Sequence, residues 1–178
     1  MKNRYKTLIQ SDTYRLGGGS IPSLLKWLRK CQTESNPILL LFWRYFFKKQ
    51  KEKHLIEIYW KCNIGPGLYL GHAYCITINP KAVIGANCNI HKGVTIGQEN
   101  RGKRKGVPTI GDCVWIGINS TIVGNVKIGD DVMIAPNTFV NCDVPSHSVV
   151  YGNPCIIKHR DNATEGYINR KWETEVLE

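Results

Sequence analysis

The sequence lacks an apolar stretch long enough to span a bilayer. Its most apolar run, Pro37 to Phe47, is well short of the roughly 20 residues that a membrane helix needs. Residues 1–10 also lack the apolar core of a secretory signal, so we expect a cytoplasmic protein. The seven cysteines are odd in number and form no pair or metal-like cluster, which favours a reducing compartment and predicts no metal site.

Acidic residues are also scarce, with 14 Asp and Glu against 24 Lys and Arg and a formal net charge of +10. The basic excess lies in residues 1–56, which hold twelve basic and three acidic residues. No recognised nucleic-acid motif accompanies it, so we expect no nucleic-acid partner. The aromatic and lysine-rich part of this segment, residues 43–53, suits either an anionic membrane surface or burial within an oligomer. We favour burial in the oligomer.

The sequence is rich in aliphatic residues that recur at every sixth position. This period fits neither a helix nor a half-buried strand, but it is typical of a parallel β-helix, in which each short strand and its corner form one unit. Small residues, mostly glycine, follow many of these positions and permit the corners. The positions are Ile58, Ile64, Leu70 and Ile76, then Ile78, Ile84, Ile90 and Ile96, and finally Ile110, Ile116, Ile122, Ile128, Ile134 and Val140.

Three parts follow from these patterns: an N-terminal basic and aromatic helical segment (1–56), a β-helix (57–158) and an acidic C-terminal tail (159–178). Residues 1–20 are polar and end in a glycine-rich hinge. Helices are expected from Ser23 to Lys30 and from Pro37 to about Lys53. The gap between Ile96 and Ile110 exceeds two six-residue units, so residues 98–108 are expected to project as a loop.

Two polar residues interrupt the repeats in a way that suggests chemistry. His72 directly follows Leu70-Gly71 at a corner, and Glu57 lies fifteen residues earlier at the entrance to the first coil. Since three units make a coil of about eighteen residues, the two side chains can meet across neighbouring coils. A carboxylate beside an imidazole fixes its tautomer and makes the other ring nitrogen a better base.

The chain resembles the serine acetyltransferase family within the hexapeptide-repeat acyltransferases. The resemblance covers residues 57–158 and implies a left-handed β-helix, a homotrimer, and acetyl-CoA bound in the groove between neighbouring subunits. It places the catalytic histidine on His72 and its carboxylate partner on Glu57, which is an Asp in serine acetyltransferases proper. The matching stretches are Glu57-Ile58, Ile64-Gly65-Pro66-Gly67-Leu68, Leu70-Gly71-His72-Ala73, Gly93-Val94-Thr95-Ile96-Gly97, Pro108-Thr109-Ile110, Val123-Gly124-Asn125-Val126, and Val144-Pro145 through Gly152-Asn153-Pro154.

Two departures from that family concern the acceptor. Gly71 stands where serine acetyltransferases carry an Asp, and Gly106-Val107 stands where they carry an Arg-His pair. Their loss removes charges that hold a zwitterion, and the chain looks closer to exopolysaccharide acetyltransferases, such as those of colanic acid. We therefore expect a sugar hydroxyl in surface-polysaccharide synthesis as the acceptor, with serine as the alternative. The residues expected to bind the acceptor are His91, Gly71, Lys105 and Val107.

The same resemblance suggests how acetyl-CoA lies along the coils. Backbone N–H groups near Gly97 or Gln98 are expected to hold the oxyanion. The pantetheine arm is expected to pass Gly117 and Ala135, and the phosphates to meet Lys158 or Arg160. Two rivals stay open at this point: a non-catalytic β-helix scaffold, and a zinc enzyme of the γ-carbonic anhydrase type. The spacing of the histidines argues against three convergent zinc ligands.

Overall fold

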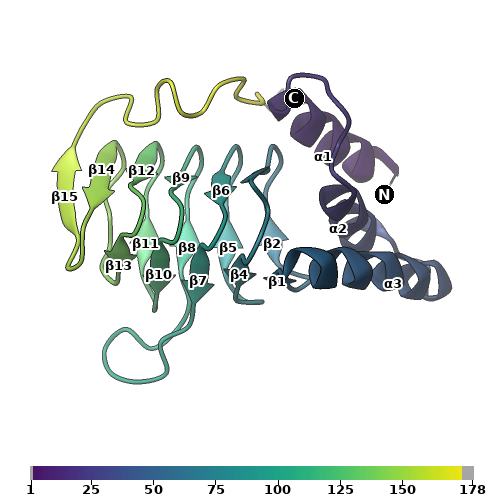
Figure 1. The fold of residues 1–178 in the computed structure, drawn as a ribbon, viewed down its shortest axis with the longest axis horizontal. Coiled ribbons are helices and arrows are strands. Elements are labelled where there is room, and N and C mark those ends of the chain that lie inside the picture. The colour runs from purple at the N-terminus through teal and green to yellow at the C-terminus, as the bar shows by residue number, and fades with distance from the viewer. Residues whose placement is uncertain (1, 174–178) are drawn as a thin grey trace.

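The computed structural model describes residues 2–173, and it confirms the parallel β-helix with an N-terminal helical segment (Figure 1). Three sheets form the faces of the coil stack, and all pairings are parallel except the last, between β14 and β15. The first sheet contains β1 (Glu57–Ile58), β4 (Thr77–Ile78), β7 (Thr95–Gly97), β10 (Thr121–Val123) and β13 (Phe139–Val140). The second contains β2 (Asn63–Ile64), β5 (Val83–Ile84), β8 (Thr109–Ile110) and β11 (Lys127–Ile128). The third contains β3 (Tyr69–Gly71), β6 (Asn89–His91), β9 (Trp115–Ile116), β12 (Val132–Ile134), β14 (Ser148–Tyr151) and β15 (Ile156–His159).

The aliphatic residues at six-residue spacing form the interior of the coils. Of the fourteen positions, all but Leu70 are buried, and Leu70 packs partly buried against the same core. The strand registers stack each residue on its equivalent in the next coil, as with Ile78 on Ile96 and Ile96 on Ile122. Burial of each such side chain contributes about 1.5–3 kcal/mol, so this column is the main source of stability in the β-helix.

The first coil is longer than the six-residue rule predicts. Ile58 pairs with Ile78, twenty residues on, whereas Ile78 pairs with Ile96 after eighteen. The two additional residues lie in the corner between β3 and β4, where Ile76 and Ile78 are both buried. His72 and Cys75 in this corner have left-handed backbone conformations, each with φ of 51°. The corner that carries His72 is therefore an enlarged one.

Three helices cap the first coil: α1 (Lys2–Arg15), α2 (Ser23–Thr33) and α3 (Pro37–His54). The sequence predicted α2 and α3, but it described residues 1–20 only as a polar segment. Helix α3 begins as expected at Asn36, whose side chain accepts hydrogen bonds from the backbone N–H groups of Ile38 and Leu39. Within residues 2–173, no helix is both long and apolar enough to cross a membrane.

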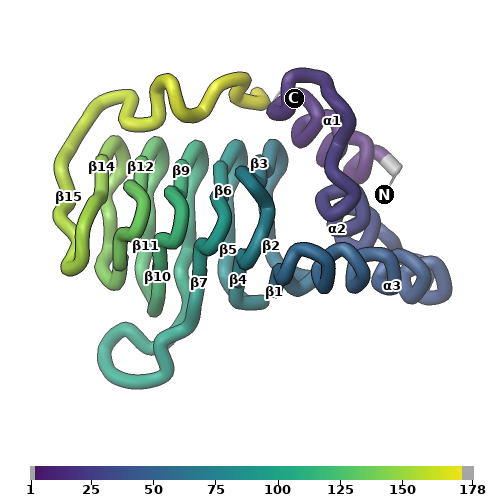
Figure 2. The backbone as a smooth tube through the Cα atoms, in the orientation of Figure 1, coloured from purple at the N-terminus to yellow at the C-terminus, as the bar shows by residue number. Residues whose placement is uncertain are grey.

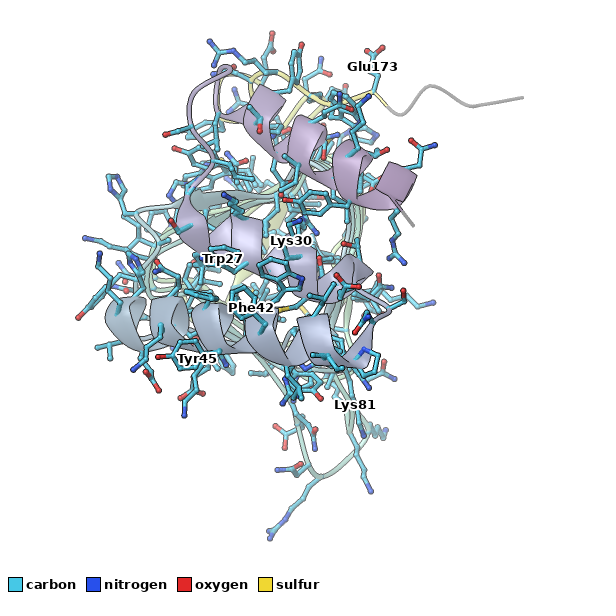
Figure 3. All side chains as sticks on the ribbon, turned by 90° about the vertical axis from the view of Figure 1, so that its right-hand side faces the viewer. Trp27, Lys30, Phe42, Tyr45, Lys81 and Glu173 are labelled. Carbon is cyan, nitrogen blue, oxygen red and sulfur yellow. The ribbon has the colours of Figure 1, made fainter. Side chains whose placement is uncertain are left out.

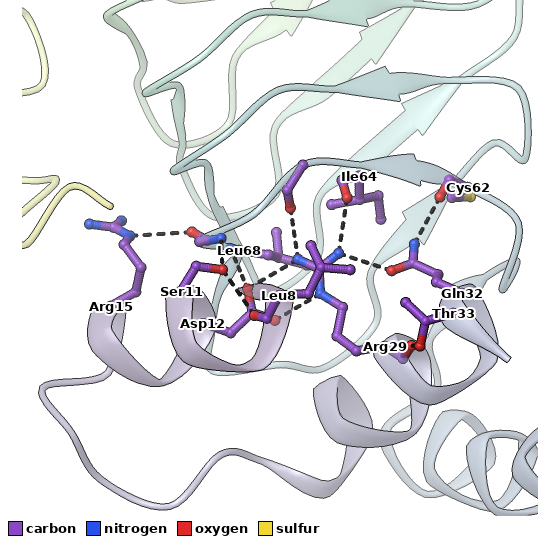
Figure 4. Close-up of polar contacts among 12 residues, drawn as sticks. Leu8, Ser11, Asp12, Arg15, Arg29, Gln32, Thr33, Cys62, Ile64 and Leu68 are labelled. Carbon is purple, nitrogen blue, oxygen red and sulfur yellow. Dashed lines mark hydrogen bonds and ion pairs between the residues drawn. The ribbon is translucent and has the colours of Figure 1, made fainter. Parts of the chain in front are cut away.

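A buried polar network, rather than an apolar face, joins α1 to the coils (Figure 4). Asp12 and Arg29, both without exposed side-chain surface, form an ion pair at 2.8 Å. Arg29 also donates to the carbonyl oxygens of Ile64 and Gly65, and the Leu68 N–H donates to Asp12 at 2.9 Å. Burial raises the pKa of Asp12, while Arg29 and the Leu68 N–H stabilise its charged form.

The C-terminal tail returns along the whole coil stack to the helices (Figure 2). Asp131 holds its start by accepting hydrogen bonds from the backbone N–H groups of Ala163 and Thr164. The Trp172 N–H donates to the side-chain oxygen of Asn87 at 2.7 Å. Arg15 of α1 donates to the carbonyl oxygen of Asn169. The tail thus links the last coils to the N-terminal cap.

The cysteines are all free thiols, as the sequence indicated. One pair nevertheless comes together: the sulfur atoms of Cys142 and Cys155 are 3.7 Å apart. Both remain free thiols, without a disulfide between them. Thirteen residues separate the two in the chain, and their approach depends on how the chain turns between β13 and β15, which the spacing alone does not reveal.

Candidate active site

His72 occupies the enlarged corner between the third sheet and the first. Directly before it, Gly71 ends β3 and pairs in register with His91 of β6. The Lys92 N–H donates to the Gly71 carbonyl oxygen at 3.0 Å, which fixes the two corners one above the other. His72 and His91, expected as base and acceptor-binding residue, therefore lie on successive coils at the same edge of the prism.

The His91 ring covers the face of Gly71. A Cβ atom added to Gly71 would lie well under 3.0 Å from the Nδ1 atom of His91, so the ring fills the space that any side chain there would need. The ring is 4.7 Å from the Trp115 ring and 6.4 Å from the Tyr69 ring, measured between centroids. Its Nε2 atom is buried and has no hydrogen-bond partner within the described residues. Burial and the neighbouring His72 lower the pKa of His91, which favours the neutral ring.

Glu57 lies in a groove of about 480 Å³ on the outer face of the first sheet. Gly97 and Gln98, the expected oxyanion-binding positions, line the same groove, so the structure brings these three predicted residues together. The sequence reading missed the other polar side chains there, which are Lys51, Tyr59, Thr77 and Asn79. A signal existed: Tyr59, Asn79 and Gly97 each follow an inward isoleucine of the first sheet, so they point outward in one row.

Glu57 and His72 are related through β4, and His72 does not line the Glu57 groove. Glu57 pairs in register with Thr77, the first residue of β4, and His72 lies in the corner that leads into β4. The Cys75 N–H in that corner donates to the His54 carbonyl oxygen at 3.0 Å, which ties the corner to the end of α3. No hydrogen bond or ion pair joins Glu57 to His72 in the part of the chain that is described. Their pairing remains a prediction.

The loop of residues 98–108 projects from the corner between β7 and β8, as expected (Figure 1). Glu99 and Gly106 form a short antiparallel bridge at its base, and the Arg104 carbonyl oxygen accepts from the Asn125 N–H at 2.9 Å. Lys105 is exposed and Val107 half-buried. A second groove, of about 350 Å³, lies between the loop and the later coils. Its lining residues are Glu99, Arg101, Lys103, Arg104, Val123, Phe139 and Asn141.

The remaining predicted cofactor residues lie on later coils. Gly117 is buried, and its N–H donates to the Ile134 carbonyl oxygen. The Ala135 N–H donates to the Val150 carbonyl oxygen, so both backbone donors are already used in hydrogen bonds between coils. Lys158 and Arg160 lie at the far end, where the Lys158 ammonium is 5.8 Å from the Tyr151 ring. Neither residue lines the Glu57 groove.

No group of three or more His, Cys, Asp or Glu residues in positions 2–173 has the arrangement of a metal site. Two of the five histidines pair with carboxylates away from the site: His147 with Asp131, and His159 with Asp161. His91 faces aromatic rings rather than a carboxylate. The described side chains therefore offer no zinc-type ligand set.

Comparisons with known proteins agree with this geometry. Residues 108–142 match the family model described as "Bacterial transferase hexapeptide (six repeats)". Serine acetyltransferase 4 of Arabidopsis thaliana is 42% identical over 99 residues, 56% of this chain and 28% of that protein. Serine acetyltransferase of Staphylococcus aureus (strain Mu50) is 37% identical over 111 residues, 62% of this chain and 52% of that protein.

Solved structures share the fold beyond the coils. Serine acetyltransferase of Brucella abortus, in complex with coenzyme A, superposes with a TM-score of 0.71 and 24% identity, covering 89% of this chain and 68% of that one. The chain thus spans about half or less of the curated relatives' length, and none of these comparisons points to exopolysaccharide enzymes. The coils thus contain hexapeptide repeats, and over these repeats the chain is similar to serine acetyltransferases.

Proposed function

We propose that this protein is an acetyl-CoA-dependent O-acetyltransferase. The observation that carries the proposal is that Glu57 pairs with the start of β4, the strand entered from the His72 corner, in coils that resemble those of serine acetyltransferases. His72 sits in an enlarged corner, and Glu57 opens a groove shared with Gly97 and Gln98. Direct transfer between two bound substrates requires a base that can reach the acceptor hydroxyl, and we assign that role to His72.

In the proposed reaction, His72 takes the proton of the acceptor hydroxyl while its oxygen attacks the thioester carbonyl. The tetrahedral intermediate then collapses, the C–S bond breaks, and the departing thiolate receives the proton from the imidazolium. Glu57 stabilises that imidazolium, and backbone N–H groups at Gly97 or Gln98 hold the oxyanion. Acetyl ester and free coenzyme A are the products. Positioned base catalysis of this kind contributes about 10²–10⁴-fold to rate.

L-serine is the acceptor to test first, because the relatives in the comparisons are serine acetyltransferases. This replaces the sugar as the leading candidate, since no comparison supports polysaccharide synthesis. One observation keeps the sugar as a second candidate: the His91 ring occupies the space over Gly71, so no side chain there can bind a zwitterion.

A homotrimer with acetyl-CoA between neighbouring subunits is part of the proposal. The groove at Glu57 is open on the outer face of the first sheet, and a neighbouring subunit would complete its wall. The phosphates of acetyl-CoA would meet Lys158 or Arg160. Light scattering of the purified protein measures the assembly directly; a monomer that retains full turnover would remove the subunit interface from the proposal.

The decisive experiment is coenzyme A release from acetyl-CoA, measured with L-serine and with a panel of neutral sugars. We expect saturable release with one acceptor class and loss of at least about 100-fold in kcat for His72→Ala. His147→Ala, a half-exposed histidine that pairs with Asp131 away from the site, is the matched control and should keep its activity. Unchanged turnover in His72→Ala would exclude the proposed base.

A further inference from the structure

An exposed apolar stripe runs along α3 on the side away from the core. Its residues recur three and four apart, so they lie on one side of the helix. The opposite side is packed: Phe47 is buried, and Trp43 lies against the core. The packing of this chain therefore leaves the stripe uncovered. The stripe consists of Ile38, Leu41, Phe42 and Tyr45, which are 76%, 64%, 51% and 58% exposed.

Aromatic residues of α2 and α3 extend the stripe into a larger surface. The Trp27 ring of α2 stacks on the Phe46 ring of α3 at 5.1 Å, and the Phe42 ring meets Phe46 edge-on at 4.8 Å. Figure 3 shows Trp27, Lys30, Phe42 and Tyr45 on α2 and α3 at the end of the molecule opposite the last coil. We call the surface formed by these residues and the stripe the helical end face.

Lysines surround this apolar surface. Lys48 and Lys49 follow Tyr45 on the next turn of α3, and Lys49 lies 5.8 Å from the Tyr45 ring. On α2, Lys26 lies 5.3 Å from the Trp27 ring, and Lys30 lies 5.0 Å from Trp43. Apart from the buried Arg29, residues 23–54 contain seven Lys and Arg against two Glu. The helical end face thus combines exposed aliphatic and aromatic side chains with positive charge.

We propose that the helical end face binds an anionic lipid surface, with the stripe at the boundary of headgroups and acyl chains and the lysines on the phosphates. Two-fold contact with a second copy would bring together two faces that both carry excess positive charge, which repel. Nucleic acid would use the positive charge but gain nothing from Ile38 and Leu41. Apolar burial together with attraction to anionic headgroups is the combination that holds interfacial helices.

The location of this face relates it to the candidate site. Lys51 lines two grooves. One lies beside the stripe and is also lined by Leu41 and Tyr45, and the other contains Glu57. Lipid binding would therefore bring the Glu57 groove close to the headgroups. The inference does not rest on the proposed function, because its evidence lies entirely in α2 and α3.

Sedimentation with vesicles tests the proposal on the full chain. Wild-type protein should pellet with vesicles of phosphatidylcholine and phosphatidylglycerol, should not pellet with pure phosphatidylcholine, and should be released at high salt. The double variant Lys48→Gln and Lys49→Gln should lower the partition coefficient about thirtyfold. Leu41→Ser with Phe42→Ser should lower it by about tenfold or more, because both side chains lose apolar burial.

The matched control is Lys103→Gln with Lys105→Gln, which removes two exposed charges from the projecting loop. This control should bind vesicles as the wild type does. Equal loss in the control would show that only net charge matters and would overturn the proposal. So would a wild type that stays in solution with anionic vesicles. A reduced molecular mass of the Leu41→Ser and Phe42→Ser variant in light scattering would assign the face to a second copy instead.

Discussion

At the scale of single residues, Gly71 and His91 form a complementary pair. The ring of His91 can lie over the backbone only because residue 71 has no side chain. We expect Gly71→Ala to lower the free energy of unfolding by about 1–3 kcal/mol, the usual cost of overpacking. In a His91→Ala background the same change should cost little. Urea denaturation of both single variants and the double variant measures this coupling; additive effects would mean that the ring and Gly71 are independent.

His91 also predicts a pH dependence of stability. An unfolded histidine titrates near pH 6.5, whereas burial and His72 lower the pKa of His91 in the folded protein. Below about pH 6.5 the unfolded chain therefore binds more protons, and the folded state loses stability as the pH falls. The urea midpoint of wild type, measured between pH 5 and pH 8, should fall more steeply on acidification than that of His91→Asn. Parallel curves would contradict a lowered pKa; His159→Asn serves as control.

Single residues also show where sequence reasoning reached its limit. The resemblance pointed to His72 and Glu57, and their pairing stays a prediction; the structure places Glu57 on β1 and His72 in the corner that leads into β4. The His91 ring over Gly71 and its contact with Trp115 depend on side-chain directions in three successive coils. Spacing fixes which face a residue takes, but not the rotamer through which it meets its neighbours.

At the scale of elements, α1 and α2 are held on the first coil by the Asp12–Arg29 pair (Figure 4). Both charges are fully buried, so removing one leaves the other without a partner in a medium of low dielectric constant. Arg29→Met should lower the free energy of unfolding by about 3–5 kcal/mol, measured by urea denaturation.

The double variant Asp12→Leu with Arg29→Met provides the control for that experiment. It removes both charges and should recover part of the loss, although the Ile64 and Gly65 carbonyl oxygens then lack a donor. A loss below about 1 kcal/mol in Arg29→Met would mean that apolar contacts of Leu24 and Leu28 suffice to dock the helices.

The elements themselves were predictable to different degrees, for a physical reason. Strands of two to four residues followed from the six-residue period, because each inward side chain must stack on the next. Helices α2 and α3 bury leucine and aromatic side chains that the sequence displays. Helix α1 packs on the first coil mainly through hydrogen bonds of Ser11, Asp12 and Arg15. Its sequence therefore has no apolar periodicity from which a helix could be predicted. A helix that is held by polar contacts is hard to predict from the spacing of apolar residues.

At the scale of the whole molecule, the C-terminal tail connects the last coils to the N-terminal helices, which local sequence patterns do not reveal. Its described part starts at the last coil, follows the stack and reaches the cap, where Arg15 donates to the Asn169 carbonyl oxygen. Composition described residues 159–178 only as acidic. Its partners Asn87, Asn89 and Asp131 lie 85, 78 and 32 residues before the tail residues that they contact, and only the assembled prism aligns them.

Asp131 is the place where this connection can be tested. Burial raises its pKa, but hydrogen bonds from Thr164, His147 and Ala163 outweigh that effect and hold the pKa below the usual value. The anchor is therefore expected to hold above about pH 4 and to be lost as the pH falls through the lowered pKa.

At neutral pH, Asp131→Ala should speed amide hydrogen exchange at Thr164 about tenfold to a hundredfold, since a hydrogen bond to a charged group contributes about 1.5–3 kcal/mol. Asp161→Ala, on the exposed side of the same tail, should leave exchange unchanged. If Asp131→Ala also leaves it unchanged, the tail is held by its contacts with Asn87 and Arg15, and the last coil contributes nothing to closing the molecule.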